Sequence, residues 1–411
     1  MYINSLIHSV FKVFPSKQAA KIVNSTTDCT FFQKKYLGAS KLLGFRAVIN
    51  KMYYFLFNKE LNYQSKSMTT KKKIVFVVNP ISGTQGKRAI LKWIDERINR
   101  TLYDYTIVKT QYAGHAEKIA ATAAKEKVDI VVAIGGDGTI NEIGRALIHT
   151  DTALGIIPCG SGNGLARHLQ IPLEPKAAID IINESSVACI DYGKINNIPF
   201  FCTCGVGFDA FVSLKFADSG KRGLLTYLEN TLHESLSYKP ETYEIENEEG
   251  TVKYKAFLIA CGNASQYGNN AYIAPQASLT DGLMDVTILE PFTVLDVPSL
   301  SFQLFNKTID QNSRIKTFRT KKIKIHRSKP GVMHYDGDPI MGGKDIEVEL
   351  IPHGLNIIVS DKKKENEPFS LLQQISEIFS GMKPKAETFA FRHSHLFELN
   401  KSLLRRLSKK Q

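Results

Sequence analysis

Residues 130–142 combine residue types that could bind phosphate groups. Ile130–Ile134 is an apolar, mostly β-branched run, which predicts a buried strand. The Gly135-Gly136-Asp137-Gly138 that follows is expected to be a loop, because glycines neither extend a strand nor start a helix easily. Thr139 then stands where the N-cap of the next helix is expected. Because backbone N–H groups and the positive end of a helix attract anions, the stretch predicts a phosphate-binding site.

One acid, Asp137, lies inside this predicted phosphate loop. A carboxylate beside phosphates repels them unless a metal ion or a proton-donating hydroxyl lies between the two. Residues 130–142 therefore suggest a bound magnesium nucleotide, with phosphoryl transfer as the candidate reaction.

Two further stretches have the same chemical character. Asn79-Pro80-Ile81-Ser82-Gly83 ends the β-branched run Ile74–Val78, and a glycine-rich stretch at 159–167 follows a short expected strand. In the second stretch, Ser161 and Asn163 could supply neutral polar contacts, while Arg167 could neutralise a phosphate.

The elements that must position these loops alternate between strands and helices over residues 74–190. This alternation predicts a doubly wound parallel sheet, with ligand-binding loops at the carboxyl ends of its strands. Lys87 and Arg88 would bring positive charge to the start of a helix expected at 89–100, unless they are simply solvated side chains.

After residue 190 the pattern changes to short strand-like runs separated by Gly, Asn, Asp or Pro. Residues 322–326 and 347–350 alternate between apolar and polar types, as half-buried strands do. We therefore expect an antiparallel β domain, built as a sandwich and interrupted by a helical insertion at 211–237. Its expected strands are 187–192, 200–203, 254–261, 283–289, 321–327, 331–335, 346–351 and 355–359.

The chain of 411 residues is long enough for two domains with tails, and its net charge of +13 points to an anionic partner. An acidic membrane surface fits better than a nucleic acid, which is not expected as a partner because no binding motif for it occurs. A basic enzyme with solvated lysines is the plainer alternative. Six cysteines without metal-type spacing fit a reducing cytosol, and neither a membrane span nor a signal peptide is predicted.

Two basic segments flank the rest of the sequence. Residues 1–67 could be an arm that lies on a membrane surface, a small helical addition, or a stretch upstream of a true start at Met68. Residues 361–411 have a weak amphipathic pattern, which could belong to a helix that binds a membrane or a partner or that packs on the protein.

Taken together, the three loop motifs resemble the catalytic domain of the diacylglycerol kinase and sphingosine kinase family of lipid kinases. They are Asn79-Pro80-x-Ser82-Gly83, Gly135-Gly136-Asp137-Gly138-Thr139-x-Asn141-Glu142 and Pro158-x-Gly160-Ser161-x-Asn163, in that order. The match continues through Asp191-Tyr192-Gly193-Lys194, Gly207-Phe208-Asp209-Ala210, Asp281-Gly282 and Asp336-Gly337-Asp338, and it covers roughly residues 72–360.

The resemblance implies phosphorylation of a lipid's primary hydroxyl, with ATP and Mg²⁺, by a cytoplasmic enzyme at the inner face of the membrane. It implies an α/β nucleotide-binding domain at 72–192, joined by a returning segment near 352–360. A β-sandwich domain for the lipid would span 193–351, with the active site in the cleft between the two domains. A homodimer is also considered.

The resemblance also implies roles for single residues. Asp137 and Asp191 match acids that organise the catalytic Mg²⁺, while Asp281 and the main chain at Leu283 match a structural Mg²⁺ site of bacterial relatives. Asp209 matches a position that recognises the head group in sphingosine kinases. Gly164 departs from the bacterial pattern, which often has an aspartate there. The implied ATP contacts are Asn79, Ser82, Gly83, Thr110, Gly136, Gly138, Thr139, Gly160, Ser161 and Asn163.

A carboxylate must take the proton of the lipid hydroxyl, and two candidates exist. Asp338 matches a catalytic glutamate of bacterial diacylglycerol kinases, and Asp137 matches the acid proposed as the base in sphingosine kinases. On the residues alone, both Asp336-Gly337-Asp338 and Asp281-Gly282 could simply be tight turns.

The acceptor is open between diacylglycerol and a sphingoid base, whose cationic amine would benefit from Asp209. An NAD kinase, which shares the Gly-Gly-Asp-Gly loop, is disfavoured by Asn141-Glu142 and by the second glycine loop. A lipid-binding pseudokinase is supported only by the acid missing at Gly164.

Overall fold

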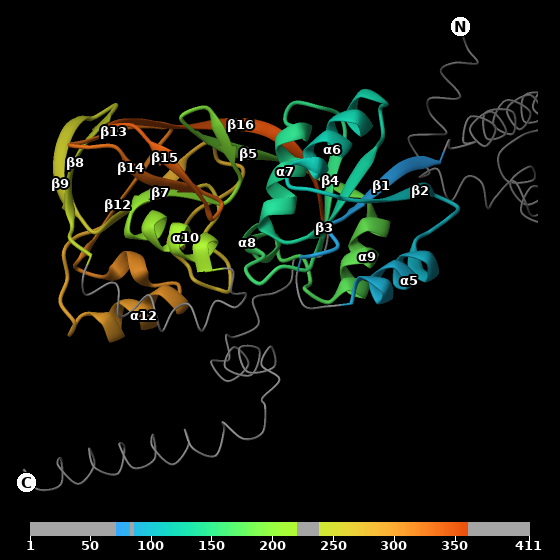
Figure 1. Cartoon of the computed structure of the whole chain (residues 1–411), viewed down its shortest axis with the longest axis horizontal. Coiled ribbons are helices and arrows are strands. Elements are labelled where there is room, and N and C mark those ends of the chain that lie inside the picture. The colour runs from blue at the N-terminus through green and yellow to red at the C-terminus, as the bar shows by residue number, and fades with distance from the viewer. Residues whose placement is uncertain (1–70, 83–85, 220–237, 361–411) are drawn as a thin grey trace, which may run out of the picture. The chain divides into compact units, whose positions relative to one another are not determined.

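The computed structural model describes residues 71–82, 86–219 and 238–360, whose course is shown in Figure 1. Gly83, the terminal segments 1–67 and 361–411, and most of the predicted insertion at 211–237 lie outside the described residues. Residues 71–74 and 99–106 belong to one compact unit, in which the Lys72 N–H donates to the Leu102 carbonyl over 2.9 Å. The remaining described residues belong to a second unit, which contains every described site residue.

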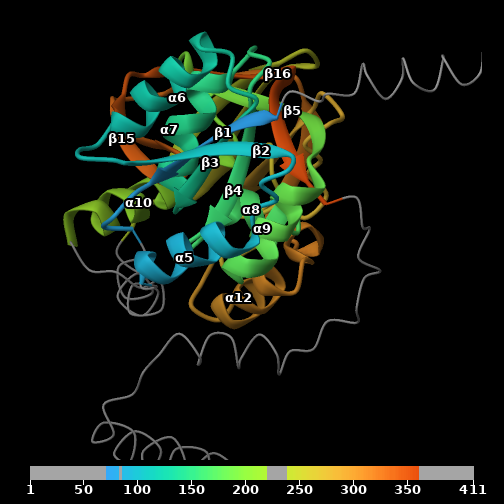
Figure 2. The same cartoon turned by 90° about the vertical axis from the view of Figure 1, so that its right-hand side faces the viewer.

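The α/β part of the chain forms a sheet in the strand order β2-β1-β3-β4-β16. β3 and β4 are parallel and buried along their whole length, as expected for apolar runs at the centre of such a sheet. Figure 2 shows α6 and α7 on one face of these two strands and α5 and α9 on the other. The strands are β1 Lys72–Val78, β2 Tyr103–Lys109, β3 Ile130–Gly135 and β4 Ala153–Pro158, and the helices are α5 Lys87–Arg97, α6 His115–Lys125, α7 Asp137–Leu147, α8 Gly164–His168 and α9 Pro175–Glu184.

The rest of the second unit is antiparallel and is built from two sheets. β13, β8 and β9 extend the first sheet beyond β16. β5 pairs with β16 and β6 pairs with β5, and the other sheet has the order β12-β11-β10-β7-β14-β15. Ile245 and Ile323 from the first sheet share one buried cluster with Val206 and Ile259 from the second, so the sheets pack face to face. The strands are β5 Ser186–Ile195, β6 Ile198–Phe200, β7 Thr203–Gly207, β8 Glu241–Asn247, β9 Gly250–Ala256, β10 Leu258–Gly262, β11 Met284–Leu289, β12 Ile315–Thr320, β13 Lys322–Arg327, β14 Gly331–Tyr335, β15 Asp338–Gly342 and β16 Asp345–Val359.

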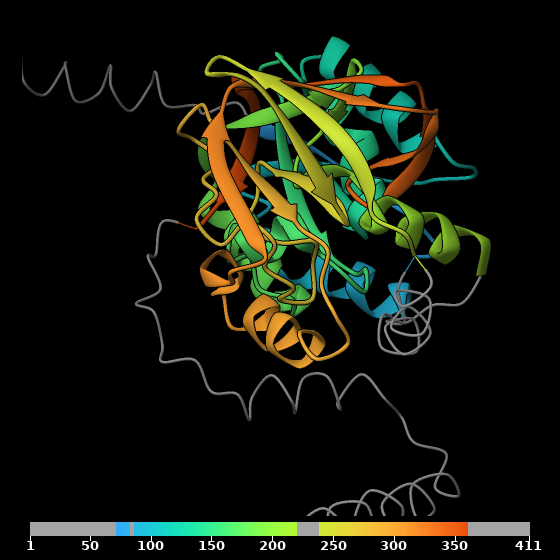
Figure 3. The same ribbon diagram turned by 90° about the vertical axis from the view of Figure 1, so that its left-hand side faces the viewer.

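Two α-helices accompany these strands, α10 Phe208–Ser219 and α12 Val297–Phe305, and both are visible in Figure 3. A short 3₁₀ turn, η2 Ile309–Gln311, follows α12. Leu300 of α12 packs into a second buried cluster with Phe257 and Ile273. In the part of the chain that the structure describes, no helix is long and apolar enough to cross a membrane.

β16 is one long strand where the sequence predicts two, at 346–351 and 355–359. It pairs with β5 along most of its length, and the register shifts between Ile351 and Leu355 where the two expected strands would have been separate. Near its end, Ile357 lies opposite Leu154 in a parallel pairing with β4. The predicted fold class, a mostly parallel α/β sheet together with antiparallel β-sheet, is thereby confirmed.

The prediction that Thr139 caps a helix is wrong. The N-cap residue of α7 is Gly136, three residues earlier, and the helix begins at Asp137, so Asp137 and Gly138 belong to its first turn rather than to a loop. Thr139 is buried in that turn, and its hydroxyl accepts a hydrogen bond from the side chain of Asn79 over 3.0 Å. The hydroxyl therefore joins the loop of Asn79 to the first turn of α7.

Candidate active site

The first loop is fastened to the start of α7 through Asn79. Its side-chain Nδ2 donates to the Thr139 hydroxyl, and its backbone N–H donates to the Ile134 carbonyl over 3.1 Å. The Asn79 Oδ1 accepts from the Ile81 N–H, and the Ser82 hydroxyl donates to the Asn79 carbonyl. The asparagine thus shapes its own loop and aligns it with the end of β3.

The two glycine loops contact each other through their backbones. A Cβ added to Gly160 would lie 2.6 Å from the Cα of Gly136, so no larger residue fits there without a shift of the chain. Asn163 has a left-handed backbone (φ 52°), and its side chain bonds to both the N–H and the carbonyl of Gly160, at 2.9 and 2.8 Å. The glycines therefore permit close contact between loops that follow adjacent parallel strands.

Asp137 joins the same two loops from the side of α7. Its carboxylate accepts the N–H of Asn163 at 2.8 Å and the N–H of Gly164 at 2.7 Å, which are the N-cap residue and the first residue of α8. Burial raises the pKa of Asp137 to about 6, although these two N–H groups oppose the rise. The half-buried acid thus titrates close to neutral pH and is already engaged by the protein's own backbone.

Three other residues predicted to contact ATP are either exposed or bonded only through their backbone. Gly138 and Ser161 are exposed, and a Cβ on Gly138 would meet nothing within 4 Å. The Thr110 N–H donates to the Val78 carbonyl at the end of β1. The structure therefore brings Asn79, Gly136, Asp137, Thr139, Gly160 and Asn163 into one assembly of loops.

Asp336 is a residue to which the sequence assigned no role. Its carboxylate accepts the N–H groups of Phe201, Cys202 and Thr203, at 2.9, 2.7 and 3.1 Å. It also accepts the side-chain Nδ2 of Asn141 on α7 over 2.8 Å. The turn between β14 and β15 is therefore attached to the helix that carries Asp137. The only sequence signal for this contact was that both residues belong to the recognised motifs.

Asp338 follows in the same turn and starts β15. Asp336 and Gly337 both have positive φ, so the tight-turn interpretation of this stretch was correct. Asp338 is exposed, and within the described residues no hydrogen bond or ion pair engages its carboxylate. Partial removal of the carboxyl from water raises the pKa of Asp338, and the negative charges of Asp336 and Glu142 raise it further. The positive charge of Arg145 opposes this rise. An unengaged carboxylate with a raised pKa is suited to accept a proton.

Asp191 is fully buried, and both of its carboxylate oxygens have backbone partners. One accepts the His353 N–H at the register shift of β16, and the other accepts the Gly282 N–H, both over 2.8 Å. Among the described residues, no group of three or more His, Cys, Asp or Glu side chains could hold a metal ion. Mg²⁺ that arrives with a nucleotide needs no such group, because phosphates, waters and one or two carboxylates suffice.

At the predicted structural magnesium site, a guanidinium supplies the positive charge. Arg319 forms ion pairs with Asp281 and with Asp285, the latter over 3.3 Å. The Leu283 N–H donates to Asp281 over 3.1 Å, which again fits the turn interpretation. Since Arg319 already compensates both carboxylates, the residues do not fit a Mg²⁺ site in this arrangement.

Asp209 is buried inside the β domain. One carboxylate oxygen accepts hydrogen bonds from the Tyr267 hydroxyl and from the His334 Nε2, each over 3.1 Å. The other oxygen accepts a hydrogen bond from the Ala210 N–H. Its side chain is 8% exposed. The carboxylate that was predicted to bind the lipid head group is therefore already hydrogen-bonded to other residues of the protein. The remaining ring nitrogen of His334, Nδ1, is buried and has no partner in the described structure.

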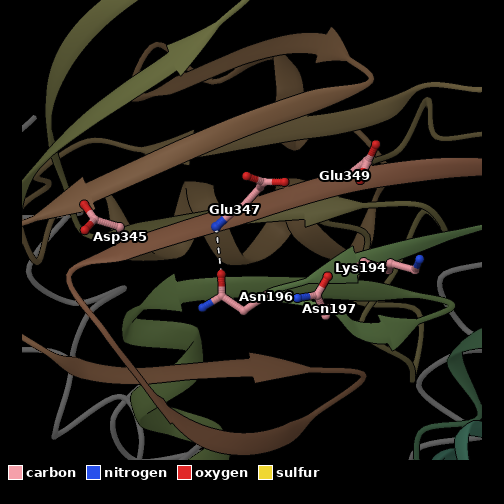
Figure 4. Close-up of a pocket in the computed structure, with 6 residues that line it drawn as sticks. All are labelled: Lys194, Asn196, Asn197, Asp345, Glu347 and Glu349. Atoms are coloured by element: carbon pink, nitrogen blue, oxygen red, sulfur yellow. Dashed lines mark hydrogen bonds between the residues drawn. The ribbon is translucent and has the colours of Figure 1, made fainter.

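A surface pocket of about 340 Å³ lies elsewhere, between β16 and the β5–β6 turn. Figure 4 shows its six lining residues, with the Glu347 N–H donating to the Asn196 side chain. No predicted site residue lines it. We therefore place the candidate site at the glycine loops and not in this pocket.

Comparisons with known proteins match both parts of the chain. Residues 73–195 match the family model of the diacylglycerol kinase catalytic domain, and residues 202–359 match that of the YegS C-terminal NAD kinase beta sandwich-like domain. The chain is 28% identical over 299 residues to a diacylglycerol kinase of Mycobacterium tuberculosis, which covers 70% of this chain and 94% of that protein. It is 27% identical over 249 residues to a probable YegS-like lipid kinase of Yersinia pestis, covering 59% and 82%.

The fold has a counterpart among solved structures. A crystal structure of a diacylglycerol kinase from Bacillus anthracis superposes with a TM-score of 0.57 at 21% identity, covering 71% of this chain and 98% of that one. This likeness concerns the fold alone. The two family matches and the curated relatives confirm the family inferred from the loop motifs, and kinases of this family use ATP. The chain belongs to the diacylglycerol kinase family of lipid kinases and is a phosphotransferase.

Proposed function

We propose that the chain transfers the γ-phosphate of Mg-ATP to the primary hydroxyl of a diacylglycerol at a membrane surface. One observation carries the proposal: the unengaged carboxylate of Asp338 lies in a turn that Asp336 attaches to α7, the helix that begins at the glycine loops. The hydrogen bond between Asn141 and Asp336 thereby connects the glycine loops, which would bind the phosphates, with the strand start that carries the proposed proton acceptor Asp338. In this proposal residues 72–192 and a returning segment near 352–360 form the nucleotide-binding domain, and residues 193–351 form the domain for the lipid.

The proposed reaction assigns separate tasks to the two candidate bases. The lipid oxygen forms a bond to the γ-phosphorus while the bond from that phosphorus to the bridging oxygen of ADP breaks, and Asp338 takes the hydroxyl proton. Asp137 positions the loops, because both of its oxygens already bind backbone N–H groups. Bound to the phosphates, Mg²⁺ would neutralise the charge that develops during transfer. Asp191 acts only through the main-chain segments that it holds.

Asp209 favours diacylglycerol over a sphingoid base as the acceptor. To bind a cationic amine, this buried carboxylate would have to give up its bonds to Tyr267 or His334. Leaving such groups unpaired costs about 1–3 kcal/mol each. A neutral diacylglycerol requires no such exchange, and the similar protein of Mycobacterium tuberculosis is named a diacylglycerol kinase.

A panel of acceptors tests this assignment. Purified full-length protein would receive ATP labelled at the γ-phosphate, with dioleoylglycerol, sphingosine or NAD as the acceptor, the lipids in mixed micelles. We expect transfer to dioleoylglycerol at least about tenfold faster than to sphingosine, given the energies above. Faster transfer to sphingosine would contradict the role of Asp209, and transfer to NAD alone would contradict a lipid acceptor altogether.

Exposed apolar side chains near α12 support the proposal that the enzyme acts at a membrane surface. We propose that this surface is the inner face of the cytoplasmic membrane. Leu295 is 89% exposed, Val294 61% and Phe302 58%, although burying such groups is favourable. The Leu304 carbonyl of the same helix accepts the Tyr272 N–H, and the nearby Asn269 N–H donates to Gly162 of the second glycine loop. One short segment, residues 269–272, therefore connects α12 with the loops that would hold ATP.

A further inference from the structure

Lys87, the first residue of α5, contains a buried ammonium group without a partner. Its Nζ is inaccessible to solvent and has no hydrogen-bond partner in the described structure. The neighbouring Arg88, by contrast, is exposed. The sequence offered a plain explanation for both, that they are solvated side chains at a helix start. For Lys87 this explanation fails, because the charge does not reach water.

The neighbour of this ammonium is the thiol of Cys159, which cannot compensate the charge. Burial raises the pKa of Cys159, and the adjacent Lys87 only opposes that rise. The thiol therefore stays neutral at physiological pH. A buried charge without a counter-ion is costly, so folded proteins rarely keep one unless an anion binds there.

The location of Lys87 identifies the anion. Cys159 directly precedes Gly160, and its own N–H donates to the Gly135 carbonyl over 2.8 Å. The backbones of Gly160 and Gly136 meet at this point, so the ammonium lies beside the junction of the two glycine loops. A nucleotide on these loops would bring its phosphate chain, and hence several negative charges, to the ammonium.

We propose that Lys87 binds the phosphate chain of ATP and that its charge stays uncompensated until the nucleotide arrives. This inference rests on the proposed nucleotide site and names the cationic residue that this site requires. It has an unusual thermodynamic consequence. A lysine held by a protein partner stabilises the free protein, whereas Lys87 lowers the stability of the free protein and raises that of the complex.

Replacing Lys87 by methionine, with Arg88→Met as the matched control, tests the proposal. Calorimetry would give the dissociation constants of ATP, ADP, AMP and adenosine, and thermal unfolding would be followed with and without ATP. For Lys87→Met we expect ATP binding weakened about 10- to 100-fold, adenosine binding unchanged within about twofold, and a Tm of the free protein at or above that of the wild type. Arg88→Met should match the wild type in each measurement.

A second measurement does not depend on the variant. Inorganic tripolyphosphate should raise the Tm of the wild-type protein and compete with ATP, since the site recognises the phosphate chain. The proposal is overturned if Lys87→Met binds ATP within about twofold of the wild type, or if it lowers the Tm of the free protein and weakens ATP and adenosine equally. A wild-type protein that binds no ATP at all would instead overturn the proposed function, and this inference with it.

Discussion

Four aspartates of the recognised motifs differ in what their carboxylates contact. Asp137, Asp191 and Asp336 accept backbone N–H groups, and each holds together segments that are distant in the chain. Asp338 alone among these four has a carboxylate that no described residue engages. The residue types were therefore a poor guide to the role of each acid, because a structural carboxylate and a catalytic one look the same in a sequence.

The titration of Asp137 leads to a prediction about pH. The pKa of this carboxyl is about 6 in the folded protein against an ordinary value of 3.8, because burial disfavours the charged form. The folded protein therefore holds this proton more tightly than the unfolded chain does. The contribution of Asp137 to stability is largest below about pH 4, falls as the pH rises to about 6, and is constant above.

Comparison with Asp137→Asn isolates this effect. The free energy of unfolding would be measured by urea titration for both proteins between pH 4 and pH 8. We expect the wild type to lose stability relative to the variant from about pH 4 to about pH 6, with no further change above. A difference that does not vary with pH, or that grows in favour of the wild type, would show that burial does not raise this pKa.

At the scale of elements, the contact between α7 and the β14–β15 turn is the one on which catalysis should depend. Removing the Asn141 side chain deletes one of four hydrogen bonds to the Asp336 carboxylate, the one that attaches the turn carrying Asp338 to α7. For Asn141→Ala we expect a loss of about 1–3 kcal/mol in unfolding free energy and at least about a tenfold fall in kcat, with the KM for ATP nearly unchanged.

Asn356→Ala is the matched control, since the Asn356 side chain also donates to a distant part of the chain, the Thr150 carbonyl, and Asn356 is not one of the residues that the candidate site brings together. It should cost comparable stability and leave kcat near the wild-type value. Equal falls in kcat for the two variants would mean that activity follows general stability and not the position of Asp338.

The exposed apolar residues in and just before α12 give a second prediction at this scale. Leu295→Asp with Phe302→Asp should lower binding of the full chain to phosphatidylglycerol vesicles about tenfold or more, because apolar burial in the interface is lost. Activity on dioctanoylglycerol in detergent micelles should be kept. Val252→Asp, at a site on β9 that is 51% exposed, should change neither quantity. Unchanged vesicle binding of the double variant would exclude α12 as the contact with the bilayer.

The elements also show what a sequence can predict here. Unbroken β-branched runs predicted β1 and β3, because a strand buried on both faces must be apolar throughout. The start of α7 was placed three residues late, because Gly-Gly-Asp-Gly favours a loop unless the neighbouring loop supplies the contacts. The strands β8, β12 and β15 and the helix α12 were not predicted. Asp336 could not be assigned a role, because its partners lie 133–195 residues away.

For the molecule as a whole, the positive charge is unevenly distributed. Residues 1–67 contain ten Lys and Arg against two acids, and residues 361–411 contain eleven against six, which together account for the net charge of +13. Residues 68–360 are neutral overall. The inference of an anionic partner therefore rests on the terminal segments, whereas the described part offers an apolar contact near α12. Attraction by terminal segments weakens with salt, while an apolar contact does not.

The central claim is that this molecule phosphorylates a diacylglycerol. The most direct measurement is the transfer of label from the γ-phosphate of ATP to dioleoylglycerol in mixed micelles, with the lipid product identified by mass. The wild type should form labelled phosphatidic acid, and Asp338→Asn should form it at least about 100-fold more slowly while binding ATP normally. A wild-type protein that binds ATP and forms no labelled lipid would contradict the account.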